Sequence, residues 1–144
     1  MSNDQTYRAL TLADYPLVSA DVIRYADTDR QGHVNNAVFS TFLETGRTQF
    51  LVPPAGPLSL PDCTFVIANL NLDYLAEITW PGEVKIGTGV VKVGNTSMQF
   101  AQGIFQNAQQ VAFARTVVVQ VNGHTGRPVP LSHAAKETLA EAVI

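Results

Sequence analysis

The feature that most constrains this chain is a polar segment, YADTDRQGHVNN at positions 25–36, followed directly by the amphipathic run Ala37–Leu51. With about 100° of rotation per residue, the apolar residues of that run share one stripe of a helix. Polar side chains such as Ser40 and Glu44 lie off the stripe. We therefore expect a long helix with one buried face. Its stripe comprises Phe39, Phe42, Leu43, Gly46 and Phe50.

Local signals mark both ends of this helix. Asn35 and Asn36 are suited to cap its first turn, because an asparagine side chain accepts a hydrogen bond from a backbone N–H that has no partner within the helix. The proline-rich segment 53–57 ends the helix and begins a loop. Gly46 costs about 1 kcal/mol relative to alanine inside a helix, so we expect the helix to approach a sheet closely at this point.

Beyond the helix, the apolar period changes to that of β-strands, and the last run alternates from Val111 to Val121 on one face. Turn-forming residues separate the later runs, so we expect consecutive strands to be antiparallel and joined by hairpins. A short helix follows from about Ser132. The expected strands are Val18–Tyr25, Cys63–Leu75, Val84–Val93, Met98–Phe105 and Val111–Val121, with turns at Trp80–Gly82, Gly94–Asn95 and Asn107–Gln109.

Length and composition favour a single domain over residues 1–144, because a chain of this size buries roughly 70% of its unfolded surface without staples. The formal charge of −3 and the lack of a basic patch argue against a nucleic-acid partner. The sequence has neither a signal peptide nor an apolar run of about 18 residues, so we expect a cytoplasmic protein with no membrane partner. The sole cysteine, Cys63, cannot form an internal disulfide.

The acidic segment has two simpler interpretations. Its spacing Asp27-x-Asp29-x-Gln31 is similar to the start of a calcium-binding EF-hand loop, but the twelfth position, which needs a bidentate glutamate, is Val38. The second interpretation is a capped loop in which Asp27 or Asp29 makes turn hydrogen bonds, since aspartates are common in turns before helices. We expect no metal site.

A family resemblance weighs against the plain capped loop. The motif residues resemble the signature of the hot-dog-fold acyl-CoA thioesterases, the 4-hydroxybenzoyl-CoA thioesterase-like family. The resemblance implies an α+β hot-dog fold, in which a five-stranded antiparallel sheet wraps a long central helix and a short C-terminal helix follows. It also implies an acyl-CoA substrate, no cofactor, and a homodimer or homotetramer with active sites between subunits. The matching residues are Tyr25, Asp27-Thr28-Asp29, Gly32–Asn36 and Glu44-x-x-Arg47.

The same resemblance implies roles for individual residues. Asp29 corresponds to the catalytic carboxylate, which acts as a nucleophile on the thioester carbonyl or as a general base for water. Asn36 corresponds to the position at the helix start whose backbone N–H points at the carbonyl oxygen. Tyr25 supports the site or packs at the end of a strand, and His33 has a chemical role or packs the loop. A thioester suits one carboxylate with N–H donors, because its thiolate leaves readily.

Substrate contacts are expected from Val34, Asn35, Phe39 and Phe42. Because Phe39 and Phe42 share the buried helical stripe, and the run Phe65–Leu75 supplies an opposing surface, we expect an apolar tunnel for a medium or long acyl or an arylacyl group. The alternative is that these side chains fill the core, so that only a short acyl group fits.

Other chemistries remain open. Glu44 is an alternative carboxylate, but it lies about 12 Å along the helix from Asn36, and a local pair with Arg47 is the simpler interpretation. The alternative function is a hot-dog protein that binds acyl-CoA or an acyl carrier without turnover, although the presence of Asp29 favours the enzyme. A hydratase of the same fold is less favoured, because the sequence lacks a match to the hydratase Asp/His arrangement.

Overall fold

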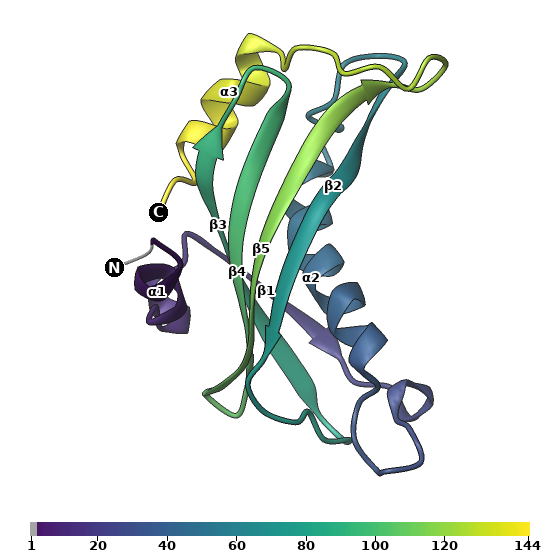
Figure 1. The fold of residues 1–144 in the computed structure, drawn as a ribbon, viewed down its shortest axis with the longest axis vertical. Helices are drawn as coiled ribbons and strands as arrows, with labels where there is room; N and C mark the ends of the chain where they lie inside the picture. Colours follow the sequence, from purple (N-terminus) through teal and green to yellow (C-terminus); the bar gives the residue numbers. More distant parts are fainter. Residues whose placement is uncertain (1–2) are drawn as a thin grey trace.

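The computed structural model describes residues 3–144, which form a long helix packed against one face of a five-stranded antiparallel sheet (Figure 1). The α+β hot-dog fold predicted from the sequence is therefore confirmed, including a short helix at the C-terminal end. The strands lie in the order β1-β3-β4-β5-β2. The elements are α1 (Asn3–Arg8), β1 (Leu17–Val22), α2 (Asn36–Leu51), β2 (Cys63–Tyr74), β3 (Glu83–Val93), β4 (Ser97–Gln106), β5 (Gln109–Asn122) and α3 (His133–Ala140).

Helix α2 begins and ends close to where its sequence predicts. The Asn35 side chain caps it by accepting a hydrogen bond from the Ala37 N–H at 2.9 Å. The predicted stripe is buried, except that Phe50 is only partly covered and Arg47 and Leu51 are buried as well. Gly46 faces the sheet so closely that a Cβ atom there would lie 2.8 Å from side-chain atoms of β3 and β4. The expected close approach of helix and sheet is confirmed.

The predicted connectivity is wrong in one respect. Hairpins join β3 to β4 and β4 to β5, but β2 and β3 are not neighbours. Strand β1 occupies the edge of β3 that a hairpin would need, so β2 pairs with β5 at the opposite side of the sheet. The turn residues Trp80–Gly82 therefore belong to a crossing segment rather than to a hairpin.

Two further details differ from the sequence expectation. Strand β1 ends at Val22, because Tyr25 belongs to the tight turn Tyr25–Asp27. In β5, the second half buries Thr116, Val118 and Gln120, whereas the alternating valines on the other face are partly exposed. The predicted alternation of valines is present. In the second half of β5, however, the buried face is the one that carries both polar and apolar residues.

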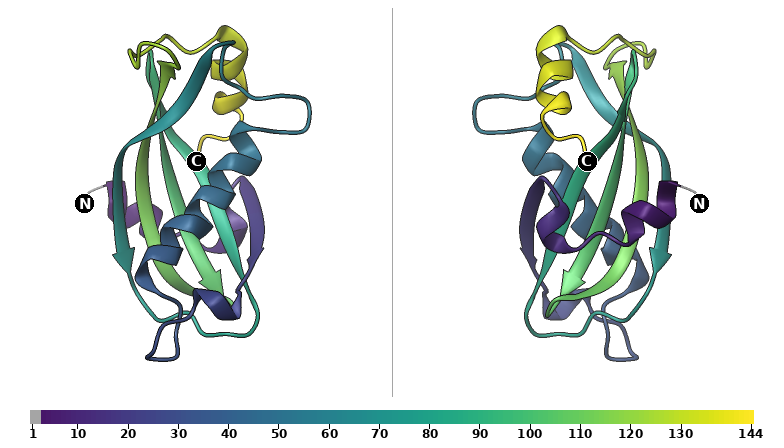
Figure 2. Two further views of the ribbon diagram at one scale, coloured as in Figure 1. Left: turned by 90° about the vertical axis from the view of Figure 1, so that its right-hand side faces the viewer. Right: turned by 90° about the vertical axis from the view of Figure 1, so that its left-hand side faces the viewer.

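The N-terminal end of the chain lies on the outer face of the sheet, opposite α2, whereas α3 lies on the same side as α2 (Figure 2), and the last residues pair with Val90 of β3. Tyr15 packs directly on Gly87, where a Cβ atom would lie 2.4 Å from its ring. Ile144 packs on Gly89 in the same way, at 2.1 Å. Both glycines thus provide space for a terminal segment. Helix α1, which the sequence did not predict, also lies on this face (Figure 2).

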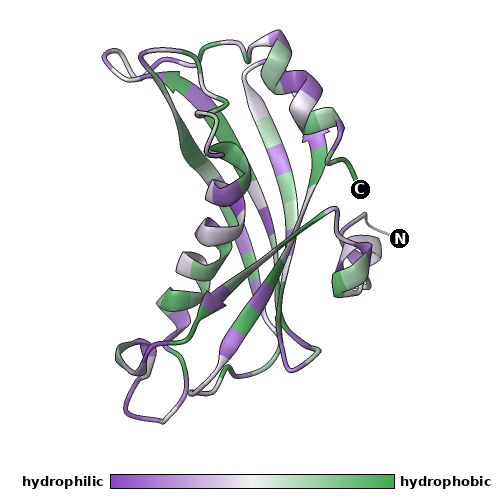
Figure 3. Cartoon of the chain, turned by 180° about the vertical axis from the view of Figure 1, so that it is seen from behind, coloured by the Kyte–Doolittle hydropathy of each residue, from purple (hydrophilic) through white to green (hydrophobic). Residues whose placement is uncertain are grey.

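Two apolar clusters hold α2 to the sheet. One surrounds its first half and includes Phe42 and Leu43, and the other surrounds its second half and includes Leu51 and, from α3, Leu139. Apolar and polar residues alternate along both α2 and the strands (Figure 3). In residues 3–144, no helix is long and apolar enough to cross a membrane.

Candidate active site at the start of helix α2

The segment between β1 and α2 forms a compact loop whose two arms run antiparallel and are hydrogen-bonded to each other. Thr28 and Val34 form a β-bridge, and the Asn35 N–H donates to the Asp27 carbonyl oxygen at 2.9 Å. A third bond anchors the loop to the segment after β2, because the Val34 N–H donates to the Ile78 carbonyl oxygen at 2.8 Å. These bonds leave residues 29–33 at the tip of the loop, next to the first turn of α2.

Asp27 holds the base of this loop. Its side chain is 3% exposed and accepts hydrogen bonds from the Arg24 backbone N–H at 2.8 Å and from Arg24 Nη2 at 2.9 Å. Burial raises the pKa of the Asp27 carboxyl, but the bonds from Arg24 and its positive charge together outweigh burial, so the pKa lies below its ordinary value. The Asp27 carboxylate therefore has a structural role in the loop.

Asp29, two residues on, is less engaged. Its Oδ1 atom accepts a hydrogen bond from the Gln31 N–H at 2.8 Å, and its side chain is 28% exposed. The backbone closes a tight turn, since the Gly32 N–H donates to the Asp29 carbonyl oxygen at 3.1 Å. Gly32 has a φ of 88°, a conformation that glycine adopts without strain. This turn presents the Asp29 carboxylate beside His33.

His33 lies between two carboxylates. Its Nδ1 atom is 3.7 Å from Asp29 Oδ2, and its Nε2 atom is 3.5 Å from Glu77 Oε1. Both distances are longer than a normal hydrogen bond, so the imidazole lies between two carboxylates without a hydrogen bond to either. Its side chain is 20% exposed and forms part of the wall of a pocket.

This pocket, of about 360 Å³, lies where α2 begins. The Asn36 carbonyl oxygen accepts a hydrogen bond from the Tyr74 hydroxyl at 3.1 Å, whereas the Asn36 N–H has no acceptor within residues 3–144. The next N–H, of Ala37, is already capped by Asn35. An open donor at a helix N-terminus is suited to polarise a carbonyl group. The pocket is lined by Gln31, His33, Val34, Asn36, Phe39, Tyr74, Leu75, Ala76 and Glu77.

The structure brings only some of the expected site residues to this pocket. His33, Val34, Asn36 and Phe39 line it. Asn35 lies beside it as the helix cap. Asp29 borders it through its contact with His33.

Two expected residues lie elsewhere. Tyr25 is 73% exposed and packs edge-on against Trp80, with ring centroids 5.2 Å apart. Phe42 is 2% exposed and lies in the core cluster.

Tyr74 and Glu77 are pocket residues that the sequence reasoning missed as site candidates. Both residues lie in the segment 74–77, at and just beyond the end of the strand expected at Cys63–Leu75. Tyr74 also packs edge-on against Phe39, with ring centroids 4.9 Å apart. The residues of the segment lie more than 30 positions from the loop, so only the sheet topology places them beside it.

The local pair expected between Glu44 and Arg47 is absent from the ion pairs of residues 3–144. Glu44 is exposed, whereas Arg47 is buried and donates from Nη1 to Gln102 Oε1 at 3.1 Å. The tertiary partner on β4 replaces the helical neighbour, because Arg47 lies on the face of α2 that packs against the sheet. Glu44 and Arg47 line a separate pocket farther along α2.

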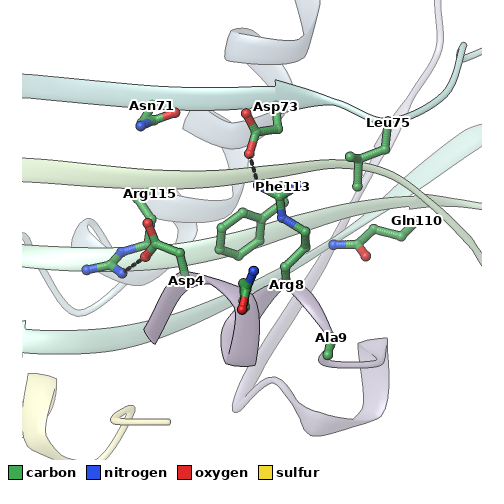
Figure 4. A pocket seen from close by; sticks show the side chains of 10 residues that line it. Asp4, Arg8, Ala9, Asn71, Asp73, Leu75, Gln110, Phe113 and Arg115 are labelled. Atoms are coloured by element: carbon green, nitrogen blue, oxygen red, sulfur yellow. Dashed lines mark hydrogen bonds and ion pairs between the residues drawn. The ribbon is translucent and has the colours of Figure 1, made fainter. Parts of the chain in front are cut away.

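A larger pocket, about 710 Å³, lies on the outer face of the sheet under α1 (Figure 4). Its charged groups pair with one another: Arg8 binds Asp73, and Arg115 binds Asp4. Leu75 is shared with the pocket at the start of α2. None of the acidic-loop residues lines this larger pocket. The larger pocket is therefore distinct from the candidate site.

Comparison with known proteins agrees with this architecture. The family model of the thioesterase-like superfamily matches residues 23–141. A predicted thioesterase from Bacillus stearothermophilus is 32% identical, with a TM-score of 0.80 over 89% of this chain and 96% of its own. A Thermus thermophilus thioesterase complexed with coenzyme A and Zn is also 32% identical, with a TM-score of 0.73 over 87% of this chain and 98% of its own. The uncharacterized protein YsmA of Bacillus subtilis is 25% identical over 118 residues, which are 81% of this chain and 80% of its own.

These matches define the class. The protein belongs to the thioesterase-like superfamily. Within the described part of the chain, no three His, Cys, Asp or Glu side chains gather in a way that would hold a metal ion.

Proposed function

We propose that this protein hydrolyses acyl-CoA thioesters to a free acid and CoA-SH, with Asp29 as nucleophile or general base. The observation that carries the proposal is a partly free carboxylate and an open helix N-terminus at one pocket. Asp29 Oδ2 lies 3.7 Å from His33 Nδ1, and the pocket is lined by His33 and by Asn36, whose backbone N–H has no acceptor within residues 3–144. Membership of the thioesterase-like superfamily and the CoA-bound Thermus relative support the substrate class.

The chemistry requires little beyond these groups. As a nucleophile, Asp29 attacks the thioester carbonyl carbon, the C–S bond breaks, CoA leaves as its thiolate, and water then hydrolyses the acyl-aspartyl anhydride. As a base, Asp29 takes a proton from water while the water oxygen attacks the same carbon, and collapse of the intermediate expels the thiolate. In both cases the Asn36 N–H stabilises the oxyanion, and such a donor is typically worth about 10²–10³ in rate. The Asn36 side-chain amide does not titrate, so its role is to orient.

The pocket favours a short or aromatic acyl group. Phe39 lines its wall, but Phe42 and Leu43 are 2% and 0% exposed in the core cluster and leave no apolar tunnel along the helix stripe. The volume of about 360 Å³ is near the lower end of the roughly 300–1,000 Å³ typical of small-molecule sites. The expectation that core residues fill this stripe is thus favoured over the tunnel.

A homodimer, or a homotetramer made of two dimers, is part of the proposal. Strand β2 pairs only with β5, and its other edge pairs with no strand of residues 3–144. An unprotected edge of this length is suited to pair with a second copy, and a two-fold dimer would place two chains at each site. Light scattering at micromolar concentration tests this part, and a fully active monomer would contradict it.

The activity is tested by thiol release from a panel running from acetyl-CoA to palmitoyl-CoA, with benzoyl-CoA included. We expect turnover, with the highest kcat/KM among short or aromatic acyl groups. Measurable affinity for acyl-CoA without hydrolysis of any member of the panel would instead support the alternative, a non-catalytic binding protein.

A further inference from the structure

A second pocket lies beside the C-terminal half of α2, against the first residues of β2. Its volume is about 340 Å³, and it is separate from the pocket at the helix start. Leu51, Phe65 and Val118 give it an apolar wall, and the exposed Ile67 lies at its rim. A cavity of this size and lining is suited to a small molecule with an aliphatic part.

One side chain makes this pocket unusual. Arg47 lines it and is only 4% exposed, yet no acidic side chain of residues 3–144 forms an ion pair with it. Its hydrogen bond within those residues goes to the neutral Gln102. Burial lowers the pKa of Arg47 and the charge of Glu44 raises it. A buried guanidinium with five N–H donors normally has a counter-charge.

Gln102 holds this guanidinium in place. Its Oε1 atom accepts from Arg47 at 3.1 Å, and its Nε2 atom donates to the Leu43 carbonyl oxygen and to Thr88 Oγ1, both at 3.0 Å. Gln102 is 0% exposed and has no freedom to turn. The network therefore fixes one side of Arg47 and leaves its remaining donors for a ligand.

We propose that this pocket binds an aliphatic carboxylate, with its chain against the apolar wall and its carboxylate paired with Arg47. A guanidinium matches the two oxygens of a carboxylate in a bidentate pair, which favours this group over a neutral head. Glu44 lies on the same pocket but is exposed, so it weakens the binding of an anion without occupying the Arg47 donors. A free carboxylic acid is the product of the proposed hydrolysis, so the link to regulation of that reaction rests on the proposed function, whereas the binding itself does not.

The sole cysteine provides a direct readout. Cys63 lines this pocket and is partly exposed, so its alkylation by neutral iodoacetamide reports whether the pocket is occupied. We expect octanoate to slow the alkylation saturably and octan-1-ol to protect at least about tenfold less well, because the alcohol lacks the charge. Protection should persist in Asp29→Asn, which separates this test from the catalytic proposal. Equal protection by octanoate and octanol would overturn the inference.

Variants with opposite expected effects sharpen the test. Arg47→Gln should weaken octanoate protection by at least about tenfold, and Glu44→Gln should strengthen it a few-fold by removing a like charge. Arg127→Gln, at an exposed arginine outside the pocket, is the matched control and should change nothing. If Arg47→Gln fails to fold, Ile67→Trp fills the rim of the pocket and should also abolish protection. Unchanged protection in a folded Arg47→Gln or in Ile67→Trp would contradict the proposal.

The source of the carboxylate is decided by kinetics. If it is a free acid, octanoate alters turnover by the wild type but not by Arg47→Gln. If it is a carboxylate unrelated to the reaction, octanoate protects Cys63 and leaves the turnover of the wild type unchanged. Either result supports carboxylate binding at Arg47 provided that octanoate protects Cys63, and a lack of that protection would overturn the proposal.

Discussion

The pocket under α1 and the pocket at the start of α2 meet at Leu75 but differ in what their polar groups do. The first is about twice as large, at about 710 Å³ against about 360 Å³, and contains two arginines and two aspartates. Those four charges form two ion pairs, Arg8 with Asp73 and Arg115 with Asp4, which fasten α1 to the sheet (Figure 4). In the smaller pocket, the Asn36 N–H has no acceptor within residues 3–144 and His33 lies loosely between two acids.

Under the proposed function, free polar groups locate the chemistry better than pocket volume does. A charge that is already paired has its hydrogen bonds satisfied and gains little from a substrate. The same contrast holds within the loop, where Asp27 is fully engaged by Arg24 and Asp29 is not. The following predictions test this division between structural and chemical groups, from the largest expected effect to the smallest.

Asp29→Asn should lower kcat/KM for thioester hydrolysis by at least about 100-fold, because a neutral amide neither attacks a carbonyl nor accepts a proton efficiently. Thiol release by the purified variant is the measurement. Asp73→Asn is the matched control, since it makes the same change in the pocket under α1 and should leave turnover near the wild-type rate. Comparable losses in both variants, or a loss in Glu44→Gln alone, would remove Asp29 from the mechanism.

Asp27→Asn should reduce the free energy of unfolding by about 2–3 kcal/mol at neutral pH, because the buried Asp27 carboxylate loses its charge-assisted hydrogen bonds from Arg24, whose own side chain is 72% exposed. Since the pKa of Asp27 is lowered in the folded state, its contribution to stability is present above the ordinary value of 3.8 and is lost as the pH falls through the folded-state pKa. Urea unfolding at several pH values should therefore show the wild type and variant converging in acid. A constant difference down to pH 2 would contradict the assigned role.

Gly46→Ala should destabilise the fold by about 1–2 kcal/mol, although alanine is the better helix former. The new methyl group would lie 2.8 Å from atoms of Gln102, Ile86 and Thr88, so α2 must shift away from the sheet. Thermal unfolding measures the effect. Ser40→Ala, on the same helix but off the buried stripe, provides the comparison, and an increase in Tm for Gly46→Ala would show that the helix packs less closely than described.

Arg8→Ala should cost less than about 1 kcal/mol, because its pair with Asp73 is roughly 40% exposed on each side and therefore screened by solvent. The loss should shrink further in high salt. Thioester hydrolysis should remain unchanged, since α1 fastens the outer face and takes no part in the loop site. A large loss of activity would mean that the pocket under α1 holds part of the substrate.

The sequence predicted those parts of the fold that depend on residues close together in the chain. Helix α2, its Asn35 cap and the strands followed from apolar periodicity and capping chemistry, which depend on neighbouring residues. Strand order did not, because the pairing of β1 with β3 is set by contacts between residues more than 60 positions apart. Helix α1 has six residues, too few for a periodic signal, and ion pairs with distant strands hold it.

The candidate site divides in the same way. Asp29, His33 and Asn36 lie within one short segment and were found together. Tyr74 and Glu77 were not predicted as site residues, because they are distant from the loop in sequence and lie beside it only through the position of β2 in the sheet. Arg47 was assigned a partner three residues away by helix geometry, but Gln102, 55 positions away, takes that place because the side chain faces the sheet. Long-range packing prevails over a local rule where the residue is buried.

The most direct test of the account is to find where a thioester-like carbonyl binds. Phenacyl-CoA carries a ketone that cannot be hydrolysed, and amide chemical shifts of the ¹⁵N-labelled protein map its position. We predict a downfield shift of the Asn36 amide proton, accompanied by changes at His33 and Tyr74, while Arg8 and Arg115 remain unperturbed. Shifts confined to Arg8, Asp73 and Arg115, with the Asn36 amide unchanged, would place the ligand under α1 and contradict the proposed site.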